Sequence, residues 1–316
     1  MSGAMIKEEG EIVDYSLIND IPMHTNWSKV EPLYKGWSDD KKFYIEDNTG
    51  QKLLLRVSDY SKYEVKRLEN EYMNKASSLG ITMSKPLDFG VCSNGKSVYL
   101  LLTWVEGEDA ETALPRISER EQYNLGLKAG QILQKIHTIP AAGNQEGWAD
   151  RYKRKIEQKI RAYRDCSVKL DNDAEFIRFL EKNISCLNYR PQVYQHGDFH
   201  IGNLIVTKDN DIGVIDFNRS DFGDPWEEFN RCVFSCKVSV PFVLGQIHGY
   251  FDQRVPDKFF RLMALYIITN IISSIPWAIP FGEEDVKYMI NNANEVYSYF
   301  NGLKTYVPIW YKESFM

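Results

Sequence analysis

Residues 195–217 contain the feature that most constrains this chain: a polar loop followed by two short apolar runs. The loop, residues 195–203, reads Gln-His-Gly-Asp-Phe-His-Ile-Gly-Asn. The apolar runs 204–206 and 212–215 flank Thr-Lys-Asp-Asn-Asp, which is rich in turn-forming residues, so the segment predicts a β-hairpin. Antiparallel pairing of 206 with 213 continues to 203 with 216. It therefore predicts Asn203 beside Asp216 at the open end, with Asp198 on the preceding loop.

These three side chains suit phosphoryl transfer. Mg²⁺ prefers hard oxygen ligands and keeps waters and substrate phosphates in its shell, so Asn203 and Asp216 are the predicted metal ligands. A further carboxylate can accept a hydrogen bond from a hydroxyl and hold it in line with a phosphorus atom. Asp198 is therefore the predicted catalytic base.

The segment resembles the catalytic core of the aminoglycoside phosphotransferase family, which shares the protein-kinase-like fold with choline and macrolide kinases. The resemblance is carried by His196-Gly197-Asp198, Asn203, Ile215-Asp216-Phe217 and Gly223-Asp224-Pro225. Protein kinases follow the Asp-Phe pair with glycine, whereas this chain has Asn218 and no Ala-Pro-Glu segment. That departure favours a small-molecule kinase over a protein kinase.

The resemblance implies an α+β, bilobal protein-kinase-like fold. We expect an N-terminal nucleotide-binding lobe over residues 5–103, made of an antiparallel sheet with one helix. A larger, mainly helical lobe over 104–316 would carry the catalytic loop and the acceptor-binding helices. The sequence pattern agrees with this order: apolar-rich runs predict strands over 30–34, 42–45, 53–57, 87–91 and 98–103, and helical periodicity predicts a helix over 63–79.

Arg56 occupies the position on the third strand where kinases place a lysine that grips the nucleotide phosphates. Arginine retains the charge and offers a bidentate fork to phosphate oxygens, so the role is kept. Its expected partner is a glutamate on the following helix. Glu71 best matches the pattern, with Glu69 and Glu64 as alternatives.

Other nucleotide contacts are implied by the resemblance. Ser38 is the predicted phosphate contact of the first loop, although Asp39 and Asp40 beside it would repel a phosphate unless they point away. The base is expected to pack near Thr103 and Val105 in the linker. Sequence does not choose between ATP and GTP as donor.

The resemblance implies a small-molecule hydroxyl acceptor, with a cationic aminoglycoside as the leading candidate. Its ammonium groups would need carboxylates, and acidic residues follow Asp216 closely. The candidates are Asp221, Asp224, Glu227 and Glu228, and later in the sequence Glu283, Glu284 and Asp285. For Asp224 a structural role in the Gly-Asp-Pro turn is the favoured interpretation. A kinase for a macrolide, choline or another metabolite is an alternative, and so is a nucleotide-binding module without transfer activity. His196 and His200 with Asp198 also match a metallohydrolase cluster, but that hypothesis leaves the hairpin unexplained.

Composition limits the remaining classes. A net charge of −6 and a pI of about 5.5 argue against nucleic acid as a partner. The apolar stretch 259–281 contains Arg261 and two prolines, so we expect a buried helix ending near Ser274 rather than a membrane span. Five cysteines without zinc-type spacing are compatible with a reducing cytoplasm. Oligomeric state is not predicted.

Overall fold

The computed structural model describes residues 15–34, 39–143 and 145–315. Ser38, the predicted phosphate contact, lies outside the described residues. The chain divides into two compact units. The first runs to Gly107 and also includes Gly213–Asn218, whereas the second comprises Glu108–Ile212 and Arg219 onward. The sequence had suggested a single boundary at 103/104, without the returning segment.

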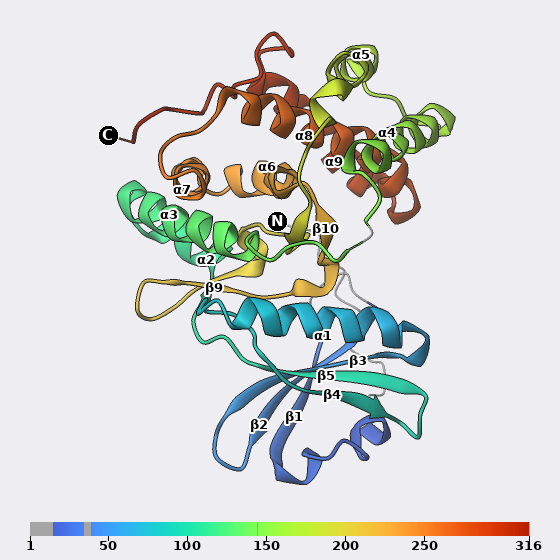
Figure 1. Ribbon diagram of the computed structural model, residues 1–316, viewed down its shortest axis with the longest axis vertical. Coiled ribbons are helices and arrows are strands. Elements are labelled where there is room, and N and C mark those ends of the chain that lie inside the picture. The colour runs from blue at the N-terminus through green and yellow to red at the C-terminus, as the bar shows by residue number, and fades with distance from the viewer. Residues whose placement is uncertain (1–14, 35–38, 144, 316) are drawn as a thin grey trace. The chain divides into compact units, whose positions relative to one another are not determined.

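The first unit is built on a five-stranded antiparallel sheet in the order β1-β2-β3-β5-β4. Its strands are β1 (Trp27–Leu33), β2 (Lys41–Asp47), β3 (Lys52–Asp59), β4 (Pro86–Cys92) and β5 (Ser97–Thr103). One helix, α1 (Tyr63–Ser77), lies along the sheet (Figure 1). The predicted antiparallel sheet with one helix is therefore confirmed.

The two faces of β3 have different roles. Leu53, Leu55 and Val57 are buried in a hydrophobic core that also takes in Ile18 and Ile21 from the N-terminal segment. The alternate residues point to the opposite face because successive side chains of a strand alternate. That second face carries Arg56, whose guanidinium meets α1. The same strand thus anchors the core and positions a charged side chain.

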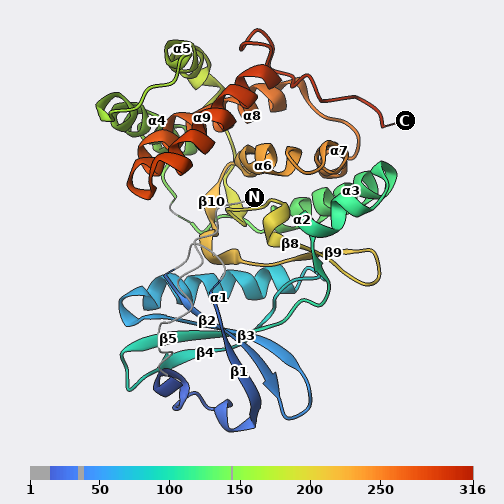
Figure 2. The same ribbon diagram turned by 180° about the vertical axis from the view of Figure 1, so that it is seen from behind.

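The second unit is mainly helical (Figure 2). Its α-helices are α2 (Ala110–Ala113), α3 (Glu119–Ile136), α4 (Trp148–Asp165), α5 (Asp173–Asn183), α6 (Cys232–Cys236), α7 (Val240–Tyr250), α8 (Asp257–Ala278) and α9 (Glu283–Tyr299). Its short strands are β6 (Glu108–Asp109), β7 (Val193–Gln195), β8 (Leu204–Val206) and β10 (Asp221–Gly223). A further strand, β9 (Ile212–Val214), begins at the last residue of this unit before the segment Gly213–Asn218, which belongs to the first unit.

The predicted hairpin is confirmed. A three-stranded sheet has the order β6-β8-β9, and the Thr207 N–H donates to the Asp211 carbonyl at 2.9 Å to close the turn. β6 pairs antiparallel with β8. Strands β7 and β10 form a separate antiparallel pair. β7 comes before the loop that carries Asp198, and β10 comes after it.

Helices α3 and α7 lie side by side in both views (Figures 1 and 2). Two glycines on each helix allow this close approach: Gly126, Gly130, Gly245 and Gly249. A Cβ atom at Gly126 would lie 2.1 Å from the Phe242 carbonyl oxygen, and one at Gly245 would lie 2.1 Å from the Tyr123 carbonyl oxygen. Any side chain here would force the backbones apart.

Helix α8 is long and apolar enough to cross a membrane, but 67% of its apolar window is buried inside the protein. A buried helix was predicted, but its end near Ser274 was wrong. The helix continues through Pro276 to Ala278. Proline lacks one N–H, and in the last turn this removes only a hydrogen bond close to the helix end.

Candidate functional site

Arg56 lies at the centre of a buried charged cluster in the first unit, and its side chain is only 3% exposed. Its Nη1 donates to Glu69 Oε1 at 3.3 Å and to Asp216 Oδ1 at 3.2 Å. Its Nε donates to Asp40 Oδ2 at 3.1 Å. Each of these carboxylates comes from a different part of the sequence, so the cluster exists only in the folded unit.

Lys66 on α1 extends the cluster. Its Nζ lies 2.8 Å from Asp40 and 2.9 Å from Glu69. Burial raises the pKa of Asp40, but the charges of Arg56 and Lys66 outweigh it and hold the pKa well below its usual range. Asp40 is therefore a carboxylate that points into the cluster, which answers the concern that it would repel a phosphate from the loop.

The expectation that Glu71 pairs with Arg56 was wrong. Glu71 is 43% exposed and forms ion pairs with Lys75 and Arg67. Glu69, one of the two alternatives, is buried and makes the contact with Arg56. Each residue of an α-helix is rotated by about 100° about the helix axis from the one before it. Glu69 and Glu71 are two residues apart and therefore lie on nearly opposite faces of α1.

Asp216 reaches Arg56 because its segment is attached to the first unit by backbone hydrogen bonds. The Val214 N–H donates to the Thr82 carbonyl at 2.9 Å, and the Ser84 N–H donates to the Val214 carbonyl at 3.1 Å. Asp216 itself has a φ of 64°, a conformation that is uncommon for residues other than glycine. Such strained positions cluster at functional sites. The Asp216 side chain remains 29% exposed, so it is accessible to a ligand.

Lys42 was not singled out from the sequence. It stands directly opposite Arg56 in the β2–β3 register, which places both side chains on the same face of the sheet. Burial lowers the pKa of Lys42, while the charge of Asp216 acts against that shift. The signal that could have identified it is the hairpin register between 42 and 56, which becomes readable only once both strand ends are known.

The linker residues occupy the end of the sheet of the first unit. The backbone N–H of Thr103 donates to the Lys85 carbonyl at 2.9 Å, and the Thr103 Oγ1 accepts the Lys85 N–H at 2.9 Å. Trp104 donates its N–H to the Lys52 carbonyl at 3.1 Å. Val105 follows with a half-buried side chain. Thr103 is thus committed to the sheet through its N–H, and its predicted role as a base contact stays a prediction, as does that of Val105.

A buried glutamate of the second unit holds residues 195–203, the loop predicted to be catalytic. Glu228 accepts the backbone N–H groups of His196 and Gly197, both at 2.8 Å. Gly197 has a φ of +83°, and a Cβ atom there would lie 1.9 Å from the Arg219 carbonyl oxygen. Only glycine fits, so the loop turns sharply at this point. Glu228 had been a candidate substrate contact, but the structure uses it to hold the loop.

Both histidines of the loop support its backbone. His196 Nδ1 accepts the Asp198 N–H at 3.2 Å, and His200 Nδ1 accepts the Gly202 N–H at 3.1 Å. Across the described part of the chain, no group of three or more His, Cys, Asp or Glu side chains is arranged to hold a metal ion. These contacts favour loop support over the metallohydrolase interpretation.

Asp198 is surrounded by positive charge. Arg231 Nε lies 3.1 Å from its Oδ1, as an ion pair without the alignment of a hydrogen bond. Arg219 Nε is 3.8 Å from Oδ2, and His200 Nε2 is 3.7 Å from Oδ1. Burial raises the pKa of Asp198, but the interaction with His200 and the charges of Arg231 and Arg219 hold it below its usual range. The carboxylate is therefore fully ionised at neutral pH.

Asn203 ends the 3₁₀ helix Ile201–Asn203. Its Nδ2 donates to the backbone carbonyl of Asp198 at 2.9 Å, which fixes the amide and leaves its Oδ1 as a possible ligand atom. An amide oxygen here and the accessible carboxylate of Asp216 are hard oxygen donors of the kind that Mg²⁺ takes together with waters and phosphates. Each residue thus carries a donor atom that suits Mg²⁺, and their use together as its ligands stays a prediction. Asn203 belongs to the second unit and Asp216 to the first.

Two further acidic residues offered as substrate contacts are occupied within the second unit. Asp224 is fully buried and receives two hydrogen bonds from Arg190, each at 2.7 Å, and another from Tyr266. Glu227 pairs with Lys155 at 2.9 Å. Asp221 is exposed, with Arg151 at 3.9 Å.

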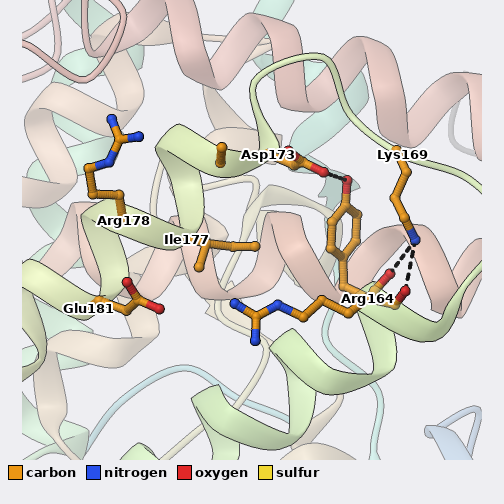
Figure 3. Close-up of a pocket in the computed structure, with 8 residues that line it drawn as sticks. Arg164, Lys169, Asp173, Ile177, Arg178 and Glu181 are labelled. Carbon is orange, nitrogen blue, oxygen red and sulfur yellow. Dashed lines mark hydrogen bonds between the residues drawn. The ribbon is translucent and has the colours of Figure 1, made fainter.

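An open pocket of about 360 Å³ lies between the end of α4 and α5 (Figure 3). Its polar groups are used largely within the protein: Lys169 donates to the carbonyls of Tyr163 and Arg164, and the Tyr163 hydroxyl donates to Asp173. These bonds complete the C-terminal end of α4. None of the described residues predicted for the functional site lines this pocket.

Known proteins resemble this chain in their sequence pattern and in their fold. The phosphotransferase enzyme family matches residues 29–260. No curated protein sequence gives a significant match.

Solved structures with the same fold include three aminoglycoside phosphotransferases. A thermostable mutant of APH(4)-Ia in its apo form has a TM-score of 0.66 and 17% identity over 92% of this chain and 100% of its own. The ADP-bound APH(2'')-Ib has a TM-score of 0.65 and 16% identity over 90% and 99%. The GDP complex of aminoglycoside 2'-phosphotransferase-IIIa has a TM-score of 0.66 and 14% identity over 90% and 96%. At these identities the likeness shows the fold alone.

Proposed function

Because the chain belongs to the phosphotransferase enzyme family, we propose that it transfers the γ-phosphoryl group of ATP or GTP to a hydroxyl of a small molecule. The observation that carries this proposal is the clamped loop, in which Glu228 and Gly197 hold an ionised Asp198. A carboxylate fixed in this way can orient an acceptor hydroxyl for attack on phosphorus.

In the proposed reaction the acceptor oxygen forms a bond to the γ-phosphorus while the bond to the β–γ bridging oxygen breaks. The nucleoside diphosphate leaves, and the hydroxyl proton is released to solvent by way of its hydrogen bond to Asp198. Because the pKa of Asp198 is lowered, its role is to orient the hydroxyl rather than to remove the proton early. A loose phosphoryl-transfer transition state requires little more than such positioning.

The charged cluster of the first unit is the proposed grip on the nucleotide phosphates. Arg56 supplies a guanidinium and Lys42 a second cation on the same face of the sheet. Asp216 and Asn203 would ligate Mg²⁺, which neutralises charge on the phosphates when bound. Arg56 already pairs with Asp216, so metal and phosphate together would replace that ion pair. The neighbours solved with ADP and with GDP leave both donors open.

An aminoglycoside is the acceptor class that the names of the solved neighbours suggest. Identity of 14–17% does not carry a substrate from one enzyme to another. Macrolides, choline and other hydroxylated metabolites therefore belong in the same test.

The test is a coupled nucleotide-turnover assay with Mg²⁺, run with ATP and GTP in parallel over a panel of these acceptors. The proposal predicts that at least one acceptor gains a phosphoryl group, about 80 Da by mass, at the expense of a single donor. Nucleotide binding with no acceptor phosphorylated anywhere in a broad panel would contradict it and favour a binding module.

A further inference from the structure

The side chains around Asp198 carry more positive than negative charge, which bears on the acceptor that the site can take. Arg231 and Arg219 both face the carboxylate, and the second of them is 49% exposed. One negative charge thus stands against two permanent positive charges, before His200 is considered. An acceptor bearing several ammonium groups would have to bring them towards this excess of positive charge, at a cost that low-dielectric surroundings increase.

A third cation, Lys159 on α4, adds to this excess. It is half-buried, and its Nζ donates to the neutral Asn270 Oδ1 at 2.9 Å. No ion pair with a carboxylate is found for Lys159 among the residues that the structure describes. Burial, followed by the charge of Lys155, lowers its pKa to about 7, and Arg231 contributes in the same direction. A half-buried ammonium group without a counterion is costly, and an anionic ligand would remove that cost.

The amide beside Lys159 is held in place by a chain of hydrogen bonds. Asn270 Nδ2 donates to Asn230 Oδ1 at 2.8 Å, and Asn230 Nδ2 in turn donates to the Glu227 backbone carbonyl. Asn230 is buried, with 8% of its surface exposed. These hydrogen bonds orient the Asn270 amide so that its oxygen accepts from Lys159, and they thereby fix the position of the Lys159 ammonium group.

The carboxylates that could have bound the ammonium groups of an acceptor already interact with groups of the protein. Glu227 neutralises Lys155, Asp224 is fully buried with Arg190, and Glu228 holds the catalytic loop. Around Lys159, the charged groups are Lys155 on its own helix, and Glu227 and Arg231 on the 3₁₀ helix Pro225–Arg231. Helix α8 contributes only the neutral Asn270. The charged groups around Lys159, counted together with Lys159 itself, therefore carry a net positive charge.

We propose that the acceptor is an anion, a hydroxylated compound bearing a carboxylate or a phosphate, and that Lys159 and Arg231 bind its negative group. The inference rests on the proposed function and gives it a substrate class. Lys159 and Arg231 are then specificity-determining residues, while Asp198 orients the hydroxyl. The range of acceptors then narrows to sugar acids, hydroxy acids and sugar phosphates, in place of polycationic drugs.

The first experiment measures kinetic constants for glucuronate and glucose 6-phosphate against glucose and glucosamine, which share one ring and differ in charge. Wild-type enzyme should favour an anion, and the better of the two identifies carboxylate or phosphate as the recognised group. Lys159→Met should raise KM for that anion by about 10- to 100-fold, as expected for loss of a hydrogen bond to a charged group, with little change in kcat. Preference for glucosamine would overturn the proposal.

Lys153→Met is the matched control. Lys153 lies on the same helix and also donates to an asparagine, Asn188 Oδ1, at 3.3 Å. Its replacement should leave KM for the anion unchanged. Unlike Lys159→Met, Lys159→Arg should retain the preference for the anion, because arginine keeps its positive charge. Equal effects of Lys153→Met and Lys159→Met would assign both lysines to helix stability alone.

The pH profile separates binding from a structural role. The lowered pKa of Lys159, about 7, means that the charge is present below that pH and is lost above it. KM for the anion should therefore rise as the pH increases through 7 in the wild-type enzyme and stay flat in Lys159→Arg. A profile that is identical in the two proteins would contradict the role of Lys159.

A binding measurement does not depend on turnover. Lysines carrying ¹³C-labelled methyl groups report their own titration by NMR, and the Lys159 signal is the one absent from Lys159→Met. Glucuronate or glucose 6-phosphate should raise the pKa of Lys159, whereas glucose and glucosamine should not. If anions shift the pKa but nothing is phosphorylated, the transferase proposal fails while the anion site stands. If neither anion shifts it, the anion site is overturned whatever the enzyme phosphorylates.

Discussion

The charged cluster around Arg56 in the first unit and the one around Asp198 in the second unit follow different principles. In the first, Arg56, Lys66 and Lys42 are matched by Asp40, Glu69 and Asp216. In the second, Arg219 and Arg231 both face Asp198, and Lys155 pairs with Glu227. Lys159 has no carboxylate partner among the residues that the structure describes. A balanced buried cluster is complete on its own, and a nucleotide entering it must bring Mg²⁺ to offset its phosphates. In the proposal above, an anionic acceptor supplies the negative charge that the second cluster lacks.

The largest effect is expected at Asp198. Asp198→Asn keeps the size of the side chain but removes the charge that orients the acceptor hydroxyl, so turnover should fall by about 10²- to 10⁴-fold. The coupled assay with the best acceptor measures this loss. Turnover close to wild type would show that the second cluster does not direct the acceptor, and the comparison between the clusters would lose its functional meaning.

Glu69 and Glu71 form a matched pair that tests whether the first cluster is balanced. Glu69→Gln leaves Arg56 and Lys66 with one carboxylate fewer in a buried setting and should lower the free energy of unfolding by about 2–3 kcal/mol. Glu71→Gln removes only exposed ion pairs and should change it by less than about 0.5 kcal/mol. Chemical denaturation of both variants gives the comparison. Equal effects would mean that Glu69 contributes no more than a surface carboxylate.

A comparison of Gly197 with Gly50 separates two costs of adding a side chain: the backbone strain of a positive φ and a steric clash with a neighbour. Their φ angles are almost the same, +83° and +84°, but a Cβ atom at Gly50 would meet nothing within 4 Å. Gly50→Ala should therefore cost only the backbone penalty of about 1–2 kcal/mol. Gly197→Ala adds the clash with the Arg219 carbonyl and should cost more, with loss of turnover because the loop carrying Asp198 moves. Thermal unfolding and turnover should be measured on both, and similar unfolding costs would rule out the clash.

Much of the first unit could be predicted because its signals are local. Apolar-rich runs indicated all five strands of its sheet, and helical spacing identified α1 within two residues. The partner of Arg56 was harder to predict. Two glutamates at 69 and 71 fit the same sequence pattern, and only the face of α1 that packs on β3 decides between them.

The second unit was less predictable in its charges than in its motifs. The motif located Asp198 and Asn203, but the roles of Glu228 and Asp224 depend on partners 31 to 34 residues earlier in the sequence. The stretch 151–164 is rich in Lys and Arg, a composition typical of a solvated helix face. Lys159 departs from that description because Asn270, more than a hundred residues later, packs against it. Long-range pairings of this kind leave no local pattern in a single sequence.

The division of labour between the two clusters is tested most directly by calorimetry of ADP with Mg²⁺, on the wild-type protein, Asp216→Asn and Asp198→Asn. We expect Asp216→Asn to weaken binding by about 10- to 100-fold, or about 1.4–2.8 kcal/mol, because a metal-ligating carboxylate is lost. Asp198→Asn should bind ADP as the wild type does, since its role concerns the acceptor. Unchanged affinity in Asp216→Asn, or a large loss in Asp198→Asn, would contradict the assignment of nucleotide to one cluster and acceptor to the other.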